Sequence, residues 1–124
     1  MHQALRPAPP ALPDISVSSF VVGRRTIVSV HGEVDVASVS ALADAVDRAL
    51  DEGALDLWID LSSTSFMDSS GLHQLLAARQ RARRLNRRFA VICPGGSIAR
   101  LFEIAGVADV LPVYRDRAAA HLAA

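Results

Sequence analysis

The stretch LDLWIDLSSTSFMDSSGL, residues 55–72, joins the strongest strand signal in the chain to a polar turn and the start of a helix. In Leu55–Leu61, Trp58 and Ile59 interrupt a simple alternation, so both faces of the strand carry apolar side chains. This pattern is typical of a central strand in a buried sheet. The segment Leu72–Leu85 follows with apolar residues at helical spacing and arginines outside that stripe. A buried strand followed by an amphipathic helix indicates an α/β fold.

Strands and helices alternate on both sides of this stretch. Upstream, we expect a hairpin of Val17–Val22 and Thr26–Val30 around Gly23, and a helix Ala37–Asp51 that Asp35 caps. Downstream, we expect strand Phe89–Cys93, a helix that Ser97 caps and Gly106 ends, strand Val110–Val113 and helix Asp116–Leu122. The order β-β-α-β-α-β-α-β-α predicts one α/β domain with a mixed sheet over residues 15–124.

Residues 1–14 contain four of the six prolines and no periodic apolar pattern, which predicts a flexible leader. They lack the charged-then-apolar layout of a secretion signal, and no apolar run approaches the roughly 18 residues that span a bilayer. We therefore expect a cytoplasmic protein that does not act at a membrane.

Thirteen arginines oppose thirteen acidic residues, so the formal net charge is zero, which argues against a dedicated nucleic-acid binder. The charges are nevertheless segregated. Residues 33–68 hold nine acids and one base, whereas residues 69–102 hold seven arginines and no acid. The second block includes the run Arg79, Arg81, Arg83, Arg84, Arg87 and Arg88.

Three interpretations of this arginine run remain open. A solvated helix face with cations near the helix C-terminus is favoured. The alternatives are a patch that binds an acidic protein, or weak contact with nucleic acid. No aromatic residue interrupts the arginines before Phe89, which disfavours nucleic acid.

The familiar catalytic and cofactor motifs are missing from the sequence. It contains no phosphate-binding loop and no dinucleotide fingerprint, and Gly95-Gly96 is better interpreted as a turn than as a phosphate cradle. The four histidines, among them His73, show no metal-ligand spacing. Cys93, the one cysteine, lies in an apolar strand and is expected to be a core residue. We expect no catalytic residue, metal or cofactor.

The segment Ser65–Leu72 has more features than a helix start requires. Asp68 and its neighbouring serines would suffice as a helix cap. However, two hydroxyls and a carboxylate lie where a strand ends, which is where open α/β sheets place ligand sites. Gly71 in the first turn suggests a close approach to the backbone. Phe66 and Met67 could pack inward or form a contact surface.

The string F-M-D-S-S-G-L, together with G-E-V-D at Gly32–Asp35 and I-A-R-L-F-E-I-A-G-V at Ile98–Val107, resembles the bacterial anti-sigma factor antagonists of the STAS domain family. The resemblance covers about residues 16–122. It implies a small sheet with helices packed mainly on one side, in a binding protein that phosphorylation controls.

The resemblance assigns specific roles around Ser69. In the family, the anti-sigma factor is itself a serine kinase and phosphorylates the serine that corresponds to Ser69. The unphosphorylated form binds the anti-sigma factor and frees the sigma factor, and a PP2C-type phosphatase resets the phosphorylated form. Asp68 and Asp35 match acids near this serine, and Ser70 is a less favoured acceptor. Some members bind nucleotide, so weak nucleotide binding is also implied.

The remaining expectations concern the surroundings of Ser69. Gly71 and Leu72 would complete its local frame, while Phe66, Met67, Ile98 and Phe102 would support the core or contact the partner, with core the favoured role. A phosphoserine adds about −1.5 to −2 charges. Free amides at the helix start would tolerate that charge, and repulsion would release the partner without a change of fold.

Two other functions are weaker candidates. The domain could be a scaffold or accessory subunit of a stress-sensing or lipid-transport complex. It could also be a small enzyme with Ser69 or Ser70 as nucleophile, but no base is evident. His73 is only four residues away on the same helix, and the sequence has no G-x-S-x-G motif.

Overall fold

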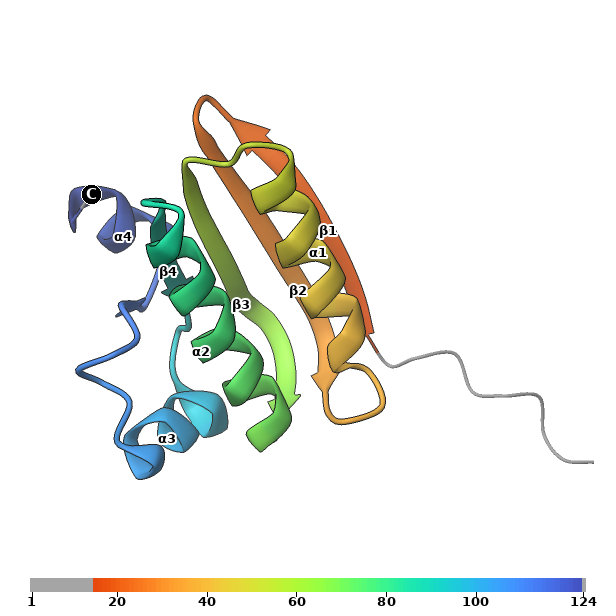
Figure 1. Ribbon diagram of the computed structural model, residues 1–124. Helices are drawn as coiled ribbons and strands as arrows, with labels where there is room; N and C mark the ends of the chain where they lie inside the picture. The colour runs from red at the N-terminus through yellow and green to blue at the C-terminus, as the bar shows by residue number, and fades with distance from the viewer. Residues whose placement is uncertain (1–14, 124) are drawn as a thin grey trace, which may run out of the picture.

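The computed structural model describes residues 15–123, and the predicted leader, residues 1–14, lies outside the described residues together with Ala124. Figure 1 shows the elements in chain order. The strands are β1 (Ile15–Val22), β2 (Arg25–Val34), β3 (Asp56–Met67), β4 (Arg88–Ile92) and β5 (Val113–Tyr114). The helices are α1 (Val39–Asp51), α2 (Ser69–Arg84), α3 (Gly96–Ala105) and α4 (Arg117–Ala123).

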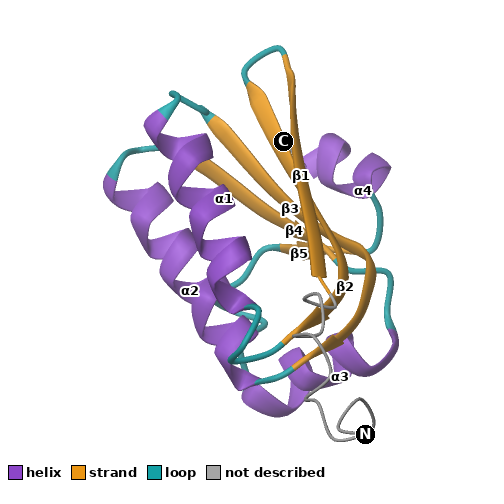
Figure 2. Cartoon of the chain, turned by 90° about the vertical axis from the view of Figure 1, so that its right-hand side faces the viewer, coloured by secondary structure: helices purple, strands orange, loops and turns teal. Residues whose placement is uncertain are grey.

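The strands form one mixed sheet in the order β1-β2-β3-β4-β5. The β1–β2 hairpin is antiparallel, and its two-residue turn has Gly23 at φ 62°. The pairs β2–β3, β3–β4 and β4–β5 are parallel. Figure 2 shows α1 and α2 on one face of the sheet and α4 on the other, with α3 at one end. The predicted α/β class and element order are therefore confirmed.

The main core lies between the sheet and the helices α1 and α2. Its members are fully buried aliphatic side chains of the central strands, such as Val28, Leu57 and Ile59, packed against Leu42 and Leu75 from the two helices. These helices form because their apolar residues recur every three or four positions and face the sheet.

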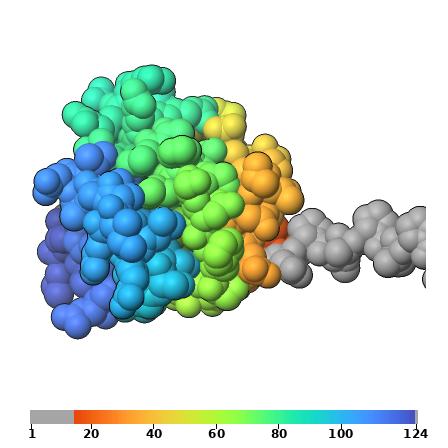
Figure 3. Space-filling view, turned by 90° about the horizontal axis from the view of Figure 1, so that it is seen from below, coloured from red at the N-terminus to blue at the C-terminus, as the bar shows by residue number. Residues whose placement is uncertain are grey.

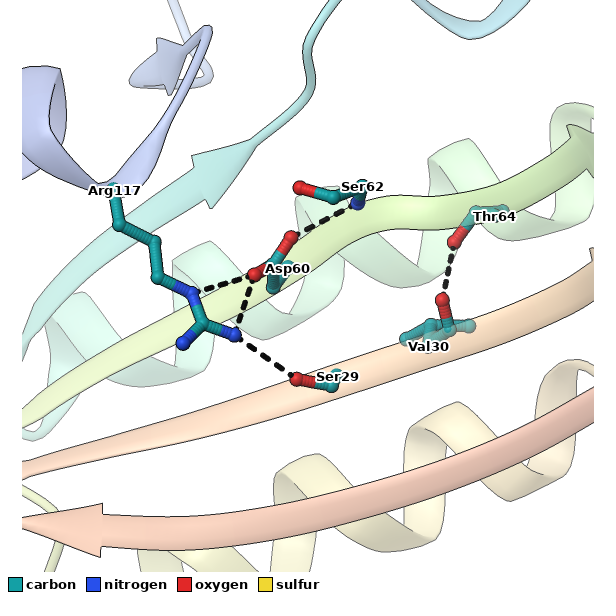
Figure 4. Close-up of polar contacts among 6 residues, drawn as sticks. All are labelled: Ser29, Val30, Asp60, Ser62, Thr64 and Arg117. Atoms are coloured by element: carbon teal, nitrogen blue, oxygen red, sulfur yellow. Dashed lines mark hydrogen bonds and ion pairs between the residues drawn. The ribbon is translucent and has the colours of Figure 1, made fainter.

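A smaller cluster holds α4 on the opposite face, where Ala120 packs with Trp58 and Ile92. Figure 4 shows the polar anchor beside it: Arg117 of α4 donates from Nε to Asp60 Oδ2 at 2.7 Å. Burial by itself would raise the pKa of Asp60, but the hydrogen bonds from Ser62 and Arg117 and the charge of Arg117 lower it below 3.8. A buried carboxylate thus ties the last helix to the middle of the sheet.

Strand β3 is longer than the sequence pattern predicts, because it continues from Leu61 to Met67. Its pairing with β2 shifts by one residue after Ser29 and again after Gly32. Between the shifts, the Thr64 hydroxyl donates to the carbonyl of Val30 at 2.8 Å (Figure 4). These bulges disturb the alternation of side chains between the two faces of the sheet. The serine-rich second half of β3 is therefore a strand although its sequence lacks the two-residue period that is typical of strands.

Other boundaries also differ from prediction: β1 begins at Ile15 rather than Val17, β2 ends at Val34 rather than Val30, and α1 begins at Val39 rather than Ala37. Helix α2 begins at Ser69 rather than Leu72, because Asp68 is its cap. Strand β5 is Val113–Tyr114 rather than Val110–Val113, since only these two residues pair with β4. Ser97 does not cap α3, because the cap position is Gly95, with φ 135°, and no side chain bonds there.

We expect Leu75→Ala to lower the free energy of unfolding by about 2–5 kcal/mol, because it leaves a cavity in the main core. Leu122→Ala is the matched control, since Leu122 on α4 is 86% exposed and its loss should change stability by less than about 0.5 kcal/mol. Urea unfolding followed by circular dichroism measures both. Equal effects would contradict this description of the core.

Candidate functional site

The predicted site lies at the edge of the sheet where β2, β3 and β4 end. Seen from below in Figure 3, the orange loop after β2, the green start of α2 and the blue residues of α3 share one face. Parallel pairing produces this arrangement, because it brings Val34 beside Met67 at the ends of β2 and β3. Open α/β sheets commonly bind ligands at this edge.

Asp68 connects the end of the sheet to the start of α2. Its backbone amide donates to the carbonyl of Val34 at 3.1 Å, which extends the β2–β3 pairing. Its side chain accepts hydrogen bonds from the amides of Ser70 at 2.9 Å and Gly71 at 3.4 Å, and from the Ser70 hydroxyl. The Ser70 hydroxyl is the main reason that the pKa of Asp68 is below 3.8, so the carboxylate is ionised at neutral pH.

The two serines after Asp68 have different environments. Ser70 is half-buried and its hydroxyl donates to Asp68 Oδ1. Ser69 occupies the first helical position and is exposed, and its side chain has no hydrogen-bond partner among residues 15–123. Of the two hydroxyls, that of Ser69 is therefore the one available to a partner.

Gly71 is required by close packing rather than by an unusual backbone conformation. A Cβ atom built at this position would lie 2.5 Å from Met67 Cγ and 3.0 Å from Val34 Cγ1. The close approach suggested by the sequence is thus made by the ends of β2 and β3. Leu72, the next residue, is buried in the main core.

Asp35 lies in the neighbouring loop between β2 and α1. Its Oδ1 atom accepts from the amides of Ala37 and Ser38, both at 3.0 Å. It therefore caps the turn before α1, whereas Ser38 occupies the cap position of the helix. The backbone bond between Asp68 and Val34 brings this loop next to the start of α2, and the Val36 amide also helps to lower the pKa of Asp68.

The four predicted contact residues separate into two groups. Met67, Ile98 and Phe102 are buried members of the main core, in agreement with their favoured role. Phe66 is 45% exposed at the end of β3, so the favoured core role is wrong for this residue. Val36 is 80% exposed in the Asp35 loop and was not predicted, because a lone valine outside a periodic segment carries no signal.

Other reactive side chains do not join this site. Cys93 is buried, and burial raises the pKa of its thiol. Within residues 15–123 no group of His, Cys, Asp and Glu side chains could hold a metal ion. None of the helices in the same range is long and apolar enough to cross a membrane.

The sequence pattern of the STAS domain matches residues 17–120, which is nearly the whole described chain. The chain belongs to the STAS domain family. An anti-sigma-B factor antagonist of Staphylococcus aureus is 30% identical over 86 residues, which cover 69% of this chain and 80% of that protein.

Solved structures of anti-sigma factor antagonists share this fold. An anti-sigma factor antagonist from Mycobacterium paratuberculosis is 28% identical, with a TM-score of 0.83 over 91% of this chain and 97% of that one. Unphosphorylated SpoIIAA, also an anti-sigma factor antagonist, is 20% identical, with a TM-score of 0.71 over 87% and 96% of the two chains. The phosphorylated form of SpoIIAA, a Bacillus cell fate determinant, superposes with a TM-score of 0.66 at 20% identity, over 88% and 100% of the chains.

We expect Gly71→Ala to destabilise the domain by about 1–3 kcal/mol, because the added methyl group overlaps Met67. In an ordinary helix interior the same change stabilises by roughly 0.5–1 kcal/mol. Chemical unfolding of Gly71→Ala, Met67→Ala and the double variant measures the effect. The double variant should be more stable than the sum of the single losses predicts, whereas a more stable Gly71→Ala would contradict the close packing.

We expect the stabilising contribution of the Asp68 charge to depend on pH. Because the folded-state pKa of Asp68 lies below 3.8, this contribution is present above pH 3.8 and is lost as the pH falls through the folded-state value. Asp68→Asn should therefore be less stable than the unmodified protein at about pH 7, and the difference should shrink as the pH falls below 3.8 through the folded-state pKa. Asp109→Asn, a change in an exposed turn, is the control. A pH-independent difference would show that the charge does not contribute.

Proposed function

We propose that this protein is an anti-sigma factor antagonist whose unphosphorylated form binds a kinase-type anti-sigma factor, so that the sigma factor is released. Phosphorylation of Ser69 by that partner ends the binding, and a PP2C-type phosphatase restores it. The observation that carries the proposal is the free, exposed Ser69 hydroxyl directly after a fixed and ionised Asp68. Relatives named as anti-sigma factor antagonists support the same partner class.

The start of α2 favours Ser69 over Ser70 as the phosphate acceptor. A kinase needs the attacking hydroxyl to be accessible, and the Ser70 hydroxyl is bonded to Asp68. A kinase that used Ser70 would have to break this bond and would loosen the cap. Ser69 can be modified while Asp68 keeps its bonds to the amides of Ser70 and Gly71.

The same bonds explain how the phosphate would act. The sequence alone suggests that free amides at the helix start accommodate the phosphate, but Asp68 already occupies those of Ser70 and Gly71. The phosphate would therefore point away from the helix, next to the Asp68 carboxylate. A contact surface with this combined negative charge repels an apolar or acidic partner surface, at a cost of several kcal/mol. No movement of α2 is needed for this repulsion.

The contact surface would include the exposed apolar side chains of the segments next to Asp68 and Ser69. Phe66 lies at the end of β3, and Val36 lies in the loop beside Asp68. Exposed aromatic and aliphatic side chains are typical anchors in protein interfaces. Met67, Ile98 and Phe102 would support this surface from the core.

Binding explains the site better than catalysis does. A serine nucleophile requires a base within hydrogen-bonding distance, and the Ser69 hydroxyl makes no hydrogen bond with His73. We propose a regulatory role without enzymatic activity of its own, in the cytoplasm with its partners. A scaffold or accessory role in a larger complex is the alternative, and detection of phosphate on Ser69 would favour the switch.

Incubation with candidate kinase-type anti-sigma factors and ATP, followed by mass mapping, tests the proposal. We expect phosphate on Ser69 in the unmodified protein and in Ser70→Ala, and none in Ser69→Ala. Calorimetry should show that phosphorylation weakens binding by about tenfold or more, which corresponds to at least about 1.4 kcal/mol. Ser69→Ala should bind as tightly as the unphosphorylated protein, with or without ATP.

Ser97→Ala is a further control, because Ser97 is exposed at the start of another helix, α3. It should behave like the unmodified protein in both assays. Phosphate on Ser70 instead of Ser69 would overturn the assignment of the acceptor. Failure of every candidate both to bind and to modify the protein would overturn the proposed function.

A further inference from the structure

The arginines at residues 79–88 differ in whether they are bonded to other parts of the fold. Arg81 pairs with Asp47 and with Asp51 of α1, the latter at 2.8 Å. Arg87 donates from Nη1 to the carbonyl of Ala54 at 2.7 Å. These two arginines therefore stabilise the fold. In contrast, Arg79, Arg83 and Arg84 of α2 form no ion pair within residues 15–123.

The three unpaired arginines line one groove, between α2 and the segment that follows α3. Figure 3 shows this segment, in blue, beside the teal residues of α2. The groove has a volume of about 540 Å³. It is lined by Leu76, Arg79, Gln80, Arg83, Arg84 and Val110.

The groove combines an apolar strip with a positive rim. Leu76 is half-buried and Val110 is 41% exposed, so both present aliphatic surface to solvent. Arg79 and Arg83 are four residues apart and hence lie on the same side of α2. Among residues 15–123 no acidic side chain lines the groove, and its nearest acidic neighbour in sequence, Asp109, is not among the lining residues.

We propose that this arginine groove binds an acidic amphipathic segment of a partner protein, with carboxylates on the three arginines and an apolar side chain on Leu76 and Val110. Guanidinium groups bind carboxylates in a planar, two-bond geometry, which suits Asp and Glu side chains. An apolar side chain of the segment would cover the aliphatic strip, which a purely ionic ligand would leave exposed to water.

Two other occupants fit less well. Single-stranded nucleic acids stack their bases on aromatic side chains, and none lines the groove. A second copy of this chain would offer the acidic face of α1, but Asp47 and Asp51 on that face already bind Arg81. The charge of the groove and its apolar strip together favour an acidic protein segment.

The groove is separate from the proposed phosphorylation site. Along a helix axis, at about 1.5 Å per residue, Arg79 and Arg83 lie roughly 15 and 21 Å from Ser69. Charges this far apart are largely screened at physiological salt, where the Debye length is about 8 Å. Occupancy of the groove should therefore not depend on the state of Ser69.

Fluorescence anisotropy with a labelled 16-residue peptide tests the proposal, the peptide carrying Glu and Leu at helical spacing. We expect saturable binding that weakens with salt. Arg79→Ala/Arg83→Ala should weaken it by about tenfold, and Val110→Ser by about threefold. Arg24→Ala/Arg48→Ala is the matched control, because it removes the same charge from exposed positions outside the groove. The control and Ser69→Glu should bind the peptide within about twofold of the unmodified protein.

Other outcomes would overturn the proposal. These are no saturable binding up to roughly 1 mM peptide, equal losses in the groove and control variants, or binding of a single-stranded oligonucleotide in preference to the peptide. Self-association that Arg79→Ala/Arg83→Ala abolishes would assign the groove to a second copy instead. Ser69→Glu tests the groove separately from the phosphorylation site. Failure of peptide binding would therefore overturn the groove proposal without contradicting the phosphorylation switch, which the mass-mapping and calorimetry experiments test.

Discussion

The hydrogen bonds of Asp68 hold together the part of the molecule that we propose as the phosphorylation site and partner surface. One bond, from its amide to the carbonyl of Val34, continues the parallel pairing of β2 and β3 beyond their last side chains. The bonds to its carboxylate begin α2 at Ser69. A single residue thus fixes where the sheet ends, where the helix starts and which serine is exposed.

The packing below Asp68 makes this arrangement rigid. Gly71 lets the first turn of α2 lie directly on Met67 and Val34, because any larger side chain at this position would overlap them. Proteins that switch by charge alone require a surface that stays in place when the charge changes. The close contact at Gly71 supplies that rigidity, and the exposed Phe66 and Val36 supply apolar area around it.

The location of the charged residues in this chain matters more than its net charge, which is zero. Part of the acidic block and part of the basic block neutralise each other where α1 and α2 lie side by side, through Asp47, Asp51 and Arg81. Along α2 and its cap, the charges outside these ion pairs are an ionised Asp68 at one end and Arg79, Arg83 and Arg84 towards the other end. Helix α2 therefore has a negative end and a positive end, and we propose a different partner for each.

Local sequence patterns determined most of the fold of this protein. The apolar runs of β3 and β4 and the helical periods of α1 and α2 depend on neighbours in sequence, and D-S-S-G marks a helix start through the cap preferences of its own residues. Tertiary structure decided that β3 continues to Met67, because the serine-rich segment is held by pairing with β2 and has no period of its own. It also decided that Arg81 is paired with Asp47 and Asp51 of α1, whereas Arg79 and Arg83 form no ion pair within residues 15–123. These features depend on contacts between segments that are far apart in sequence. Residue type and local spacing do not predict such contacts.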